Sequence, residues 1–137
     1  EILSINIEEI EGIGPVLAGK LREAGIKTVA DLLNACAAPK GRHDLAAQTG
    51  LAEKQLLKWA NMADLMRVSG IGPEFSELLE AAGVDTVKEL RNRNAENLAT
   101  KLAEVNTAKK LTRRVPSAAE VGRWIESAKT LDARMTY

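Results

Sequence analysis

The chain has 137 residues, enough for one domain or two very small ones. Apolar residues make up 45% of it and aromatic residues only 3%, so we expect a helical core of Leu, Ile, Val and Ala. One cysteine and one histidine exclude a disulfide framework and a cysteine or histidine metal centre, and we expect no cofactor. The net charge of zero argues against a strongly basic, nonspecific nucleic-acid binder.

No apolar run approaches the ~18 residues of a membrane span, and no secretory leader is visible. We therefore expect a cytoplasmic monomer. Residues 1–66 carry 7 basic and 9 acidic groups, and residues 67–137 carry 12 and 10. Because the two signs are so evenly divided, any basic surface must be local.

The chain begins with a lead-in, residues 1–6, and a short predicted helix at 7–10 that Asn6 caps. Gly12-Ile13-Gly14-Pro15 then predicts a tight turn, because glycine takes positive φ at little cost. Proline suits the first position of the helix that follows, 15–24. We name this turn hairpin one and expect Ile13 to point into the core.

Three further helices are predicted before the middle of the chain. Thr28 has N-cap chemistry and opens a helix at 29–37, with Asp31 in its first turn. Pro39-Lys40-Gly41 should break that helix, and Asp44 can cap a short one through Ala47. A long helix, 51–66, then carries an apolar stripe and leads straight into the second half of the chain.

The second half repeats the first. Gly70-Ile71-Gly72-Pro73, which we name hairpin two, follows hairpin one by 58 positions, and ten of 22 positions are identical between 11–32 and 69–90. We therefore expect two repeats, 1–66 and 67–137, packed as one unit.

Capping patterns predict the remaining helices. The helix after hairpin two covers 73–82, and Thr86 with Glu89 forms the next capping box. Asn94 and Asn106 suit the N-caps of helices at 95–104 and 107–114, and Ser117 with Glu120 opens a helix at 118–131. The tail, 132–137, should be frayed. Since no stretch alternates like a strand, the fold is predicted to be all-α, with about eight to ten helices.

Each repeat resembles a helix-hairpin-helix motif. The resemblance rests on the apolar-x-Gly-apolar-Gly-Pro turn, the helix after it, and Ala-Gly-apolar-x-Thr-Val at residues 24–29 and 82–87. Tandem copies resemble the paired modules of DNA repair and recombination proteins. The chain from about 5 to 131 is still more similar to a bacterial family of unknown function built from such repeats, on the stretches 83–90, 94–98 and 113–117. The resemblance implies a compact array of two tandem helix-hairpin-helix repeats joined by a long helix.

It also implies that the hairpins grip a phosphate backbone without reading bases. Unpaired N–H groups at a helix start, with the helix dipole behind them, favour an anion. The implied contacts are Gly12, Ile13, Gly14, Val16 and Leu17 in repeat one, and Gly70, Ile71, Gly72, Glu74 and Phe75 in repeat two. The alternative is that the glycines only permit a tight corner.

Side chains distinguish the two hairpins. Lys20, Arg22 and Lys27 follow hairpin one, whereas Glu74, Glu77 and Glu80 follow hairpin two. Two like charges ~6 Å apart repel by about 3 kcal/mol at an effective dielectric of ~20. We therefore expect hairpin one to bind phosphate more readily than hairpin two.

A second basic candidate is the cluster Lys109, Lys110, Arg113 and Arg114, which would lie within about 140° of one helix face at 100° per residue. Arg91, Arg93, Lys101 and Arg123 could extend it. Such a cluster would neutralise phosphates. The alternative is a solvated helix face whose arginines complement a helix C-terminus.

The other candidate residues favour structural roles. Trp59 and Trp124 could stack on bases, but their matched places in the repeats favour the core, and Cys36 lies among apolar helical positions. His43 has no nucleophile partner, and no catalytic constellation is present, so we expect no enzyme.

Two function classes remain open. One is DNA-backbone binding, which gains if Lys20, Arg22 and the 109–114 cluster share a face with hairpin one. The other is interaction with an unidentified protein through the hairpins as rigid corners, which gains if an apolar patch is exposed there.

Overall fold

The computed structural model describes residues 4–137, so residues 1–3 of the predicted lead-in lie outside the described part. Residues 4–137 form eight α-helices and one 3₁₀ turn, and the one strand-like contact among them is an isolated bridge between Asn6 and Thr28. The predicted all-α class is confirmed. The elements are η1 (Ile7–Glu9), α1 (Pro15–Glu23), α2 (Val29–Cys36), α3 (Pro39–Thr49), α4 (Glu53–Leu65), α5 (Pro73–Ala81), α6 (Val87–Leu90), α7 (Ala95–Lys109) and α8 (Ala118–Ala128).

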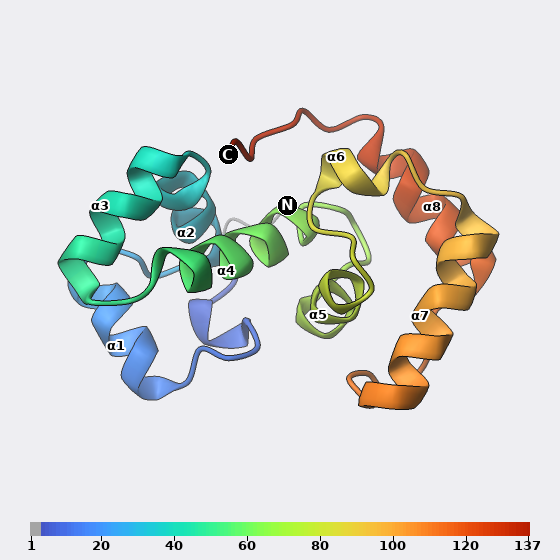
Figure 1. Cartoon of the computed structure of the whole chain (residues 1–137), viewed down its shortest axis with the longest axis horizontal. Helices are drawn as coiled ribbons and strands as arrows, with labels where there is room; N and C mark the ends of the chain where they lie inside the picture. Colours follow the sequence, from blue (N-terminus) through green and yellow to red (C-terminus); the bar gives the residue numbers. More distant parts are fainter. Residues whose placement is uncertain (1–3) are drawn as a thin grey trace.

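The helices gather in two halves that α4 connects (Figure 1). Helices α1 to α3 lie in one half and α5 to α8 in the other, and α4 packs on both α2 and α5. The apolar core divides in the same way. One buried cluster runs from Ile7 to Met66, and the other runs from Leu65 to Ala128. Trp59, Trp124 and Cys36 are buried in these clusters, as predicted.

Short polar residues set the helix starts. Thr28 and Asp31 form a complete capping box, in which the Asp31 N–H donates to Thr28 Oγ1 at 3.1 Å and the Thr28 N–H donates to Asp31 Oδ2 at 3.0 Å. The boxes predicted at Thr86 and Ser117 are only half formed. Their hydroxyls accept the expected N–H groups, but the partner carboxylates of Glu89 and Glu120 bind Arg93 and Arg114 instead.

The predicted break before Pro39 is confirmed, because α2 ends at Cys36, but residues 39–41 are themselves helical. Proline needs no hydrogen-bond acceptor at the first helical position, and Pro39 begins α3 there. Asp44 lies inside α3 and pairs with Lys40 at 2.7 Å instead of capping a new helix. Gly41 serves close packing, because a Cβ at this position would lie 1.9 Å from the Ala35 carbonyl oxygen of α2.

The predicted helix at 107–114 is also wrong. Helix α7 runs through Asn106 and ends at Lys109, and its C-cap residue Lys110 has a left-handed backbone with φ 54°. The Asn106 side chain then clamps the loop. Its Oδ1 accepts the Thr112 N–H at 2.9 Å, and its Nδ2 donates to the Thr112 carbonyl at 3.1 Å. The clamp crosses six residues, so it cannot be read from a local capping pattern.

The tail is not frayed, contrary to the prediction. Helix α8 ends at Ala128, and the following chain crosses back to the first half (Figure 1). The Thr136 N–H donates to the Ala37 carbonyl at 2.8 Å. Met135 is 8% exposed and joins the first core cluster. The last six residues therefore tie the end of the chain to repeat one.

Candidate nucleic-acid interface

The two hairpin turns are built alike. Gly12 and Gly70 have φ values of 96° and 95°, a left-handed conformation that side chains other than glycine rarely adopt. A Cβ on Gly12 would lie 3.3 Å from Trp59 Nε1, and a Cβ on Gly70 would lie 3.0 Å from Trp124 Nε1. Each tryptophan therefore supports the hairpin of its own half. Ile13 and Ile71 are buried behind the turns, as predicted.

Helices α1 and α5 begin directly behind these turns without a side-chain cap. Gly14 and Gly72 are their N-caps, with extended φ values of −86° and −97°, and a proline follows each. The first N–H groups of each helix therefore lack a side-chain acceptor. Helices α3 and α4 also start uncapped, so the neighbouring side chains must decide which start suits an anion.

Hairpin one has few basic groups at its mouth. Val16 is 75% exposed there, and Leu17 is half-buried. Arg22 turns toward η1, where it binds Glu8 Oε1 at 3.0 Å and Asn6 Oδ1 at 3.1 Å. Lys20 lines a hollow with Gln48 and Thr49 at the end of α3. The structure thus directs these two side chains to other elements.

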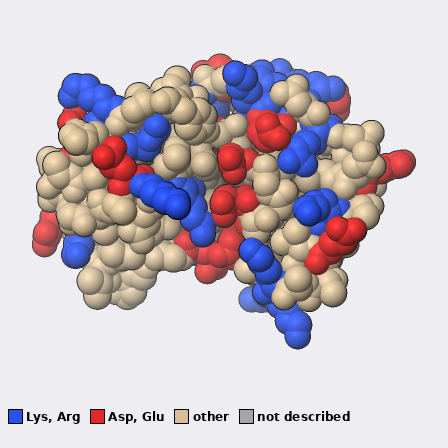
Figure 2. All heavy atoms as spheres, in the orientation of Figure 1, with Lys and Arg blue, Asp and Glu red and all other residues tan. Residues whose placement is uncertain are grey.

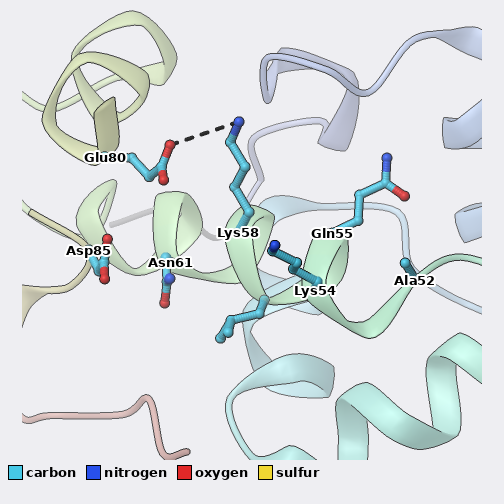
Figure 3. Close-up of a pocket in the computed structure, with 8 residues that line it drawn as sticks. Ala52, Lys54, Gln55, Lys58, Asn61, Glu80 and Asp85 are labelled. Carbon is cyan, nitrogen blue, oxygen red and sulfur yellow. Dashed lines mark ion pairs between the residues drawn. The ribbon is translucent and has the colours of Figure 1, made fainter. Parts of the chain in front are cut away.

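Two acidic side chains, Glu11 and Glu77, lie near each other at hairpin one. Burial raises the pKa of Glu77 on α5, and the negative charge of Glu11, which precedes Gly12, raises this pKa further. Glu80 faces α4 as well, with its Oε1 3.9 Å from Lys58 Nζ (Figure 3). Of the three glutamates expected to repel phosphate at hairpin two, only Glu74 lies in the exposed first turn of α5.

Arg114, the last residue of the basic segment 109–114, contacts the first turn of α5, directly behind hairpin two. Phe75, the third residue of α5, lies 5.2 Å from the Trp124 ring, centroid to centroid. Arg114 lies over the Phe75 ring, with its Cζ 5.0 Å from the ring centroid. Glu120 holds Arg114 with two hydrogen bonds of 2.8 Å, and these bonds keep the pKa of Glu120 below its ordinary value. The structure therefore joins two features that are separate in the sequence.

Arg123 lies next to the same turn. With Ser69, Gly70 and Trp124 it lines a hollow of about 390 Å³, which Glu120 and Ser127 complete. Within residues 4–137, Arg123 forms no ion pair. In the sequence, Arg123 is predicted only as an extension of the 109–114 cluster. The sequence feature that could have placed Arg123 at hairpin two is its position directly before Trp124, because that tryptophan supports the turn.

The four basic residues at 109–114 do not share one helix face. Lys109 ends α7, and Lys110, Arg113 and Arg114 lie in the exposed loop after it. On the face shown in Figure 2, basic atoms project at the lower right, in the region of the α7 end, and acidic atoms run down the middle. Because α1 lies in the opposite half, Lys20 and Arg22 do not join this cluster.

An open groove of about 540 Å³ lies along α4 (Figure 3). Its lining mixes two lysines, two carboxylates, two amides and two apolar side chains: Ala52, Lys54, Gln55, Leu57, Lys58, Asn61, Glu80 and Asp85. The mixture defines no ligand class. Residues 4–137 contain no cluster of three metal-binding side chains. No helix in that range has both the length and the apolar character needed to cross a bilayer.

Comparison with protein families shows that residues 11–131 match the Domain of unknown function (DUF4332). The chain belongs to this family. Neither the curated proteins nor the solved structures contain a match to the chain. The DUF4332 match covers both hairpins and the 109–114 segment, so all of them are parts of the family domain.

Proposed function

We propose that this DUF4332 domain is a non-catalytic module that holds a nucleic-acid phosphate backbone, with hairpin two as its principal contact. The observation that carries the proposal is the stacking of Arg114 on Phe75, 5.0 Å from the ring centroid. This contact anchors the basic segment 109–114 beside the uncapped start of α5. The resemblance to helix-hairpin-helix modules supports the same role for the turn.

The chemistry at hairpin two suits a phosphate. The first N–H groups of α5 supply donors and the positive end of the helix dipole. Arg123 adds an arginine at the hollow beside Ser69 and Gly70. Lys110 and Arg113 extend the positive charge along the loop. These contacts go to the backbone, so we expect no sequence preference.

The affinity should be modest. Glu120 neutralises Arg114, and Glu74 remains in the first turn of α5. The zero net charge adds no long-range attraction. We therefore expect dissociation constants in the micromolar range or weaker, as is typical of nonspecific binding.

The test is fluorescence anisotropy of labelled duplex and single-stranded DNA at about 50 and 200 mM salt. Roughly three phosphate contacts would give a slope near −2.7, so binding should weaken roughly 40-fold over this range. Arg123→Glu and a Lys110→Glu/Arg113→Glu double variant should each weaken binding at least tenfold. These variants should weaken DNA binding more than Lys20→Glu does, because Lys20 lies on α1 in the other half.

Lys54→Glu is the matched control, because Lys54 is an exposed lysine on α4 away from hairpin two. It makes the same change in net charge as Arg123→Glu and should alter binding less than threefold. If the control weakens binding as much as Arg123→Glu, the attraction depends on net charge alone. That result, or no binding at 50 mM salt by the folded protein, contradicts the proposal.

Hairpin one supports a second candidate function, interaction with a protein. The specific observation is Val16, an apolar side chain that is 75% exposed at the mouth of the turn. A photo-crosslinking residue placed at position 16 should capture a defined partner, and the glycines and proline around it would act as a rigid corner. With the probe moved to position 17, Val16→Asp should abolish the defined product. If the probe gives only a diffuse set of products, and the set is the same with and without Val16→Asp, this second function is wrong.

A further inference from the structure

The tail occupies a built seat on repeat one, formed by the end of α2, the start of α3 and the side of α4. The Thr136 N–H donates to the Ala37 carbonyl at 2.8 Å, and the Thr136 carbonyl accepts from Arg42 Nη2 at 2.8 Å. Both backbone groups of one extended residue are therefore paired with the seat. Peptides that add to a folded surface are commonly recognised through such backbone pairing.

Arg42 organises this seat. Its side chain is buried, with 6% of the residue exposed, and its Nη1 donates to the carbonyls of Cys36 and Ala37 at 2.9 and 3.2 Å. These carbonyls end α2, where a positive charge is favourable. One guanidinium thus satisfies the helix end and receives the Thr136 carbonyl. The seat therefore has a preformed donor aimed at an incoming peptide carbonyl.

Side chains on both sides of Thr136 add specificity. Met135 is the one member of the first core cluster that comes from beyond Met66, among the described residues. Tyr137 lies with its ring 5.8 Å from Arg42 Cζ, and its hydroxyl donates to Asn61 Oδ1 at 3.3 Å. The seat thus encloses an apolar residue and a backbone unit, and it contacts the aromatic residue, which is 70% exposed.

We propose that the seat is a binding site for an extended apolar–Thr–aromatic segment, filled in cis by residues 135–137 and able to take the same segment from a second copy of the chain. Thr130, Asp132 and Ala133, which lead to the seat, are exposed. Before the seat, the tail is held by Arg67, which binds Asp132 Oδ1 at 2.7 Å, and by Arg134, which binds Asn34. Every copy carries the matching segment, and exchange of an identical element between copies needs no new surface.

The first test is an NMR titration of the ¹⁵N-labelled full chain with an unlabelled peptide of residues 131–137. In Met135→Asp the tail carries a charge that the apolar seat rejects, so the seat should be open. The amide signals of Ala37, Arg42 and Asn61 should then shift with added peptide. Wild type should need at least tenfold more peptide, because its own tail competes at a high effective concentration.

Ala133→Asp is the matched control, because it places the same charge in an exposed part of the tail. It should behave like wild type. A folded Met135→Asp variant whose signals do not shift, or one that responds no better than Ala133→Asp, would overturn the proposal. If Met135→Asp does not fold, Thr136→Pro replaces it, since proline removes the N–H that binds Ala37. If neither folds, the tail is an integral part of repeat one and the proposal is wrong.

The second test addresses the second copy. Met135→Asp has an open seat and a defective tail, and Arg42→Gln has a defective seat and an intact tail. Sedimentation of a 1:1 mixture should show a species of about twice the 14.8 kDa chain mass that neither variant forms alone. An entirely monomeric mixture of two folded variants would overturn exchange between copies.

Discussion

Individual glycines in this chain have different structural roles. Gly41 allows α3 to approach α2, because a Cβ there would lie 1.9 Å from the Ala35 oxygen. Gly12 and Gly70 supply left-handed turns against tryptophan rings. A Cβ on Gly19 would meet nothing within 4 Å. Sequence patterns predicted the hairpin glycines, but Gly41 depends on a neighbouring helix and was taken for a helix breaker.

Gly41→Ala should strongly destabilise the protein. The new methyl group would have to displace backbone rather than a flexible side chain, so we expect a loss of about 3 kcal/mol or more. Gly19→Ala in α1 is the matched control and should gain about 0.5–1 kcal/mol, because alanine favours a helix interior. Thermal unfolding followed by circular dichroism measures both. Equal melting temperatures for the two variants would show that the α2–α3 contact is not as close as described.

Lys110 is the one residue other than glycine with positive φ in residues 4–137. A left-handed backbone costs a side-chain-bearing residue roughly 1 kcal/mol relative to glycine. Lys110→Gly should therefore stabilise the protein by about 1 kcal/mol, whereas Lys109→Gly in the last turn of α7 should not. Urea unfolding curves of the two variants compare them directly. A destabilised Lys110→Gly variant would contradict the left-handed end of α7.

Whole elements were predictable where their start signals are local. The caps Asn6, Thr28, Thr86, Asn94 and Ser117 all accept N–H groups of their own helices. Where the deciding contact is distant, prediction failed. Asn106 binds the backbone of Thr112 instead of capping a helix. The predicted fraying of the tail was wrong because Arg42 and Ala37, which lie 94 and 99 positions before Thr136, bind it.

The Thr28 capping box makes a pH-dependent contribution to the stability of α2. The N–H groups of Lys27 and Thr28 bind the Asp31 carboxylate and lower its pKa from the ordinary 3.8. Because the folded pKa is depressed, this stabilisation is complete above the unfolded pKa and is lost as the pH falls through the folded value.

Asp31→Asn removes that contribution. We expect a loss in the order of 1 kcal/mol at pH 7, since an amide accepts these hydrogen bonds less strongly than a carboxylate. The difference from wild type should shrink below pH 3.8, where wild-type Asp31 becomes protonated. Melting temperatures of both proteins from pH 2 to pH 7 test this. A difference that stays constant across the range would show that the charge of Asp31 has no part in the cap.

At the scale of the whole molecule, the two similar hairpins have different charged side chains around them. Hairpin one lies beside Glu11 and Glu77, whereas hairpin two lies beside Arg114 and Arg123 together with Glu74 and Glu120. The sequence alone favours hairpin one as the phosphate contact, because the charges on the helix after each hairpin are the local signal that it offers. The side chains that distinguish the two hairpins come from α5, α8 and the loop after α7. Their positions depend on how the halves pack, which no local pattern contains.

The most direct test of the account is a map of the DNA contact on the intact protein. In a ¹⁵N NMR titration with a short unlabelled duplex at low salt, the account predicts the largest shifts at the amides of Ser69, Gly70, Gly72 and Phe75. Smaller shifts should follow at Lys110, Arg113 and Arg123, and hairpin one should change little. Shifts centred on Gly12, Gly14 and Val16, or an unchanged spectrum, would contradict the assignment of phosphate binding to hairpin two.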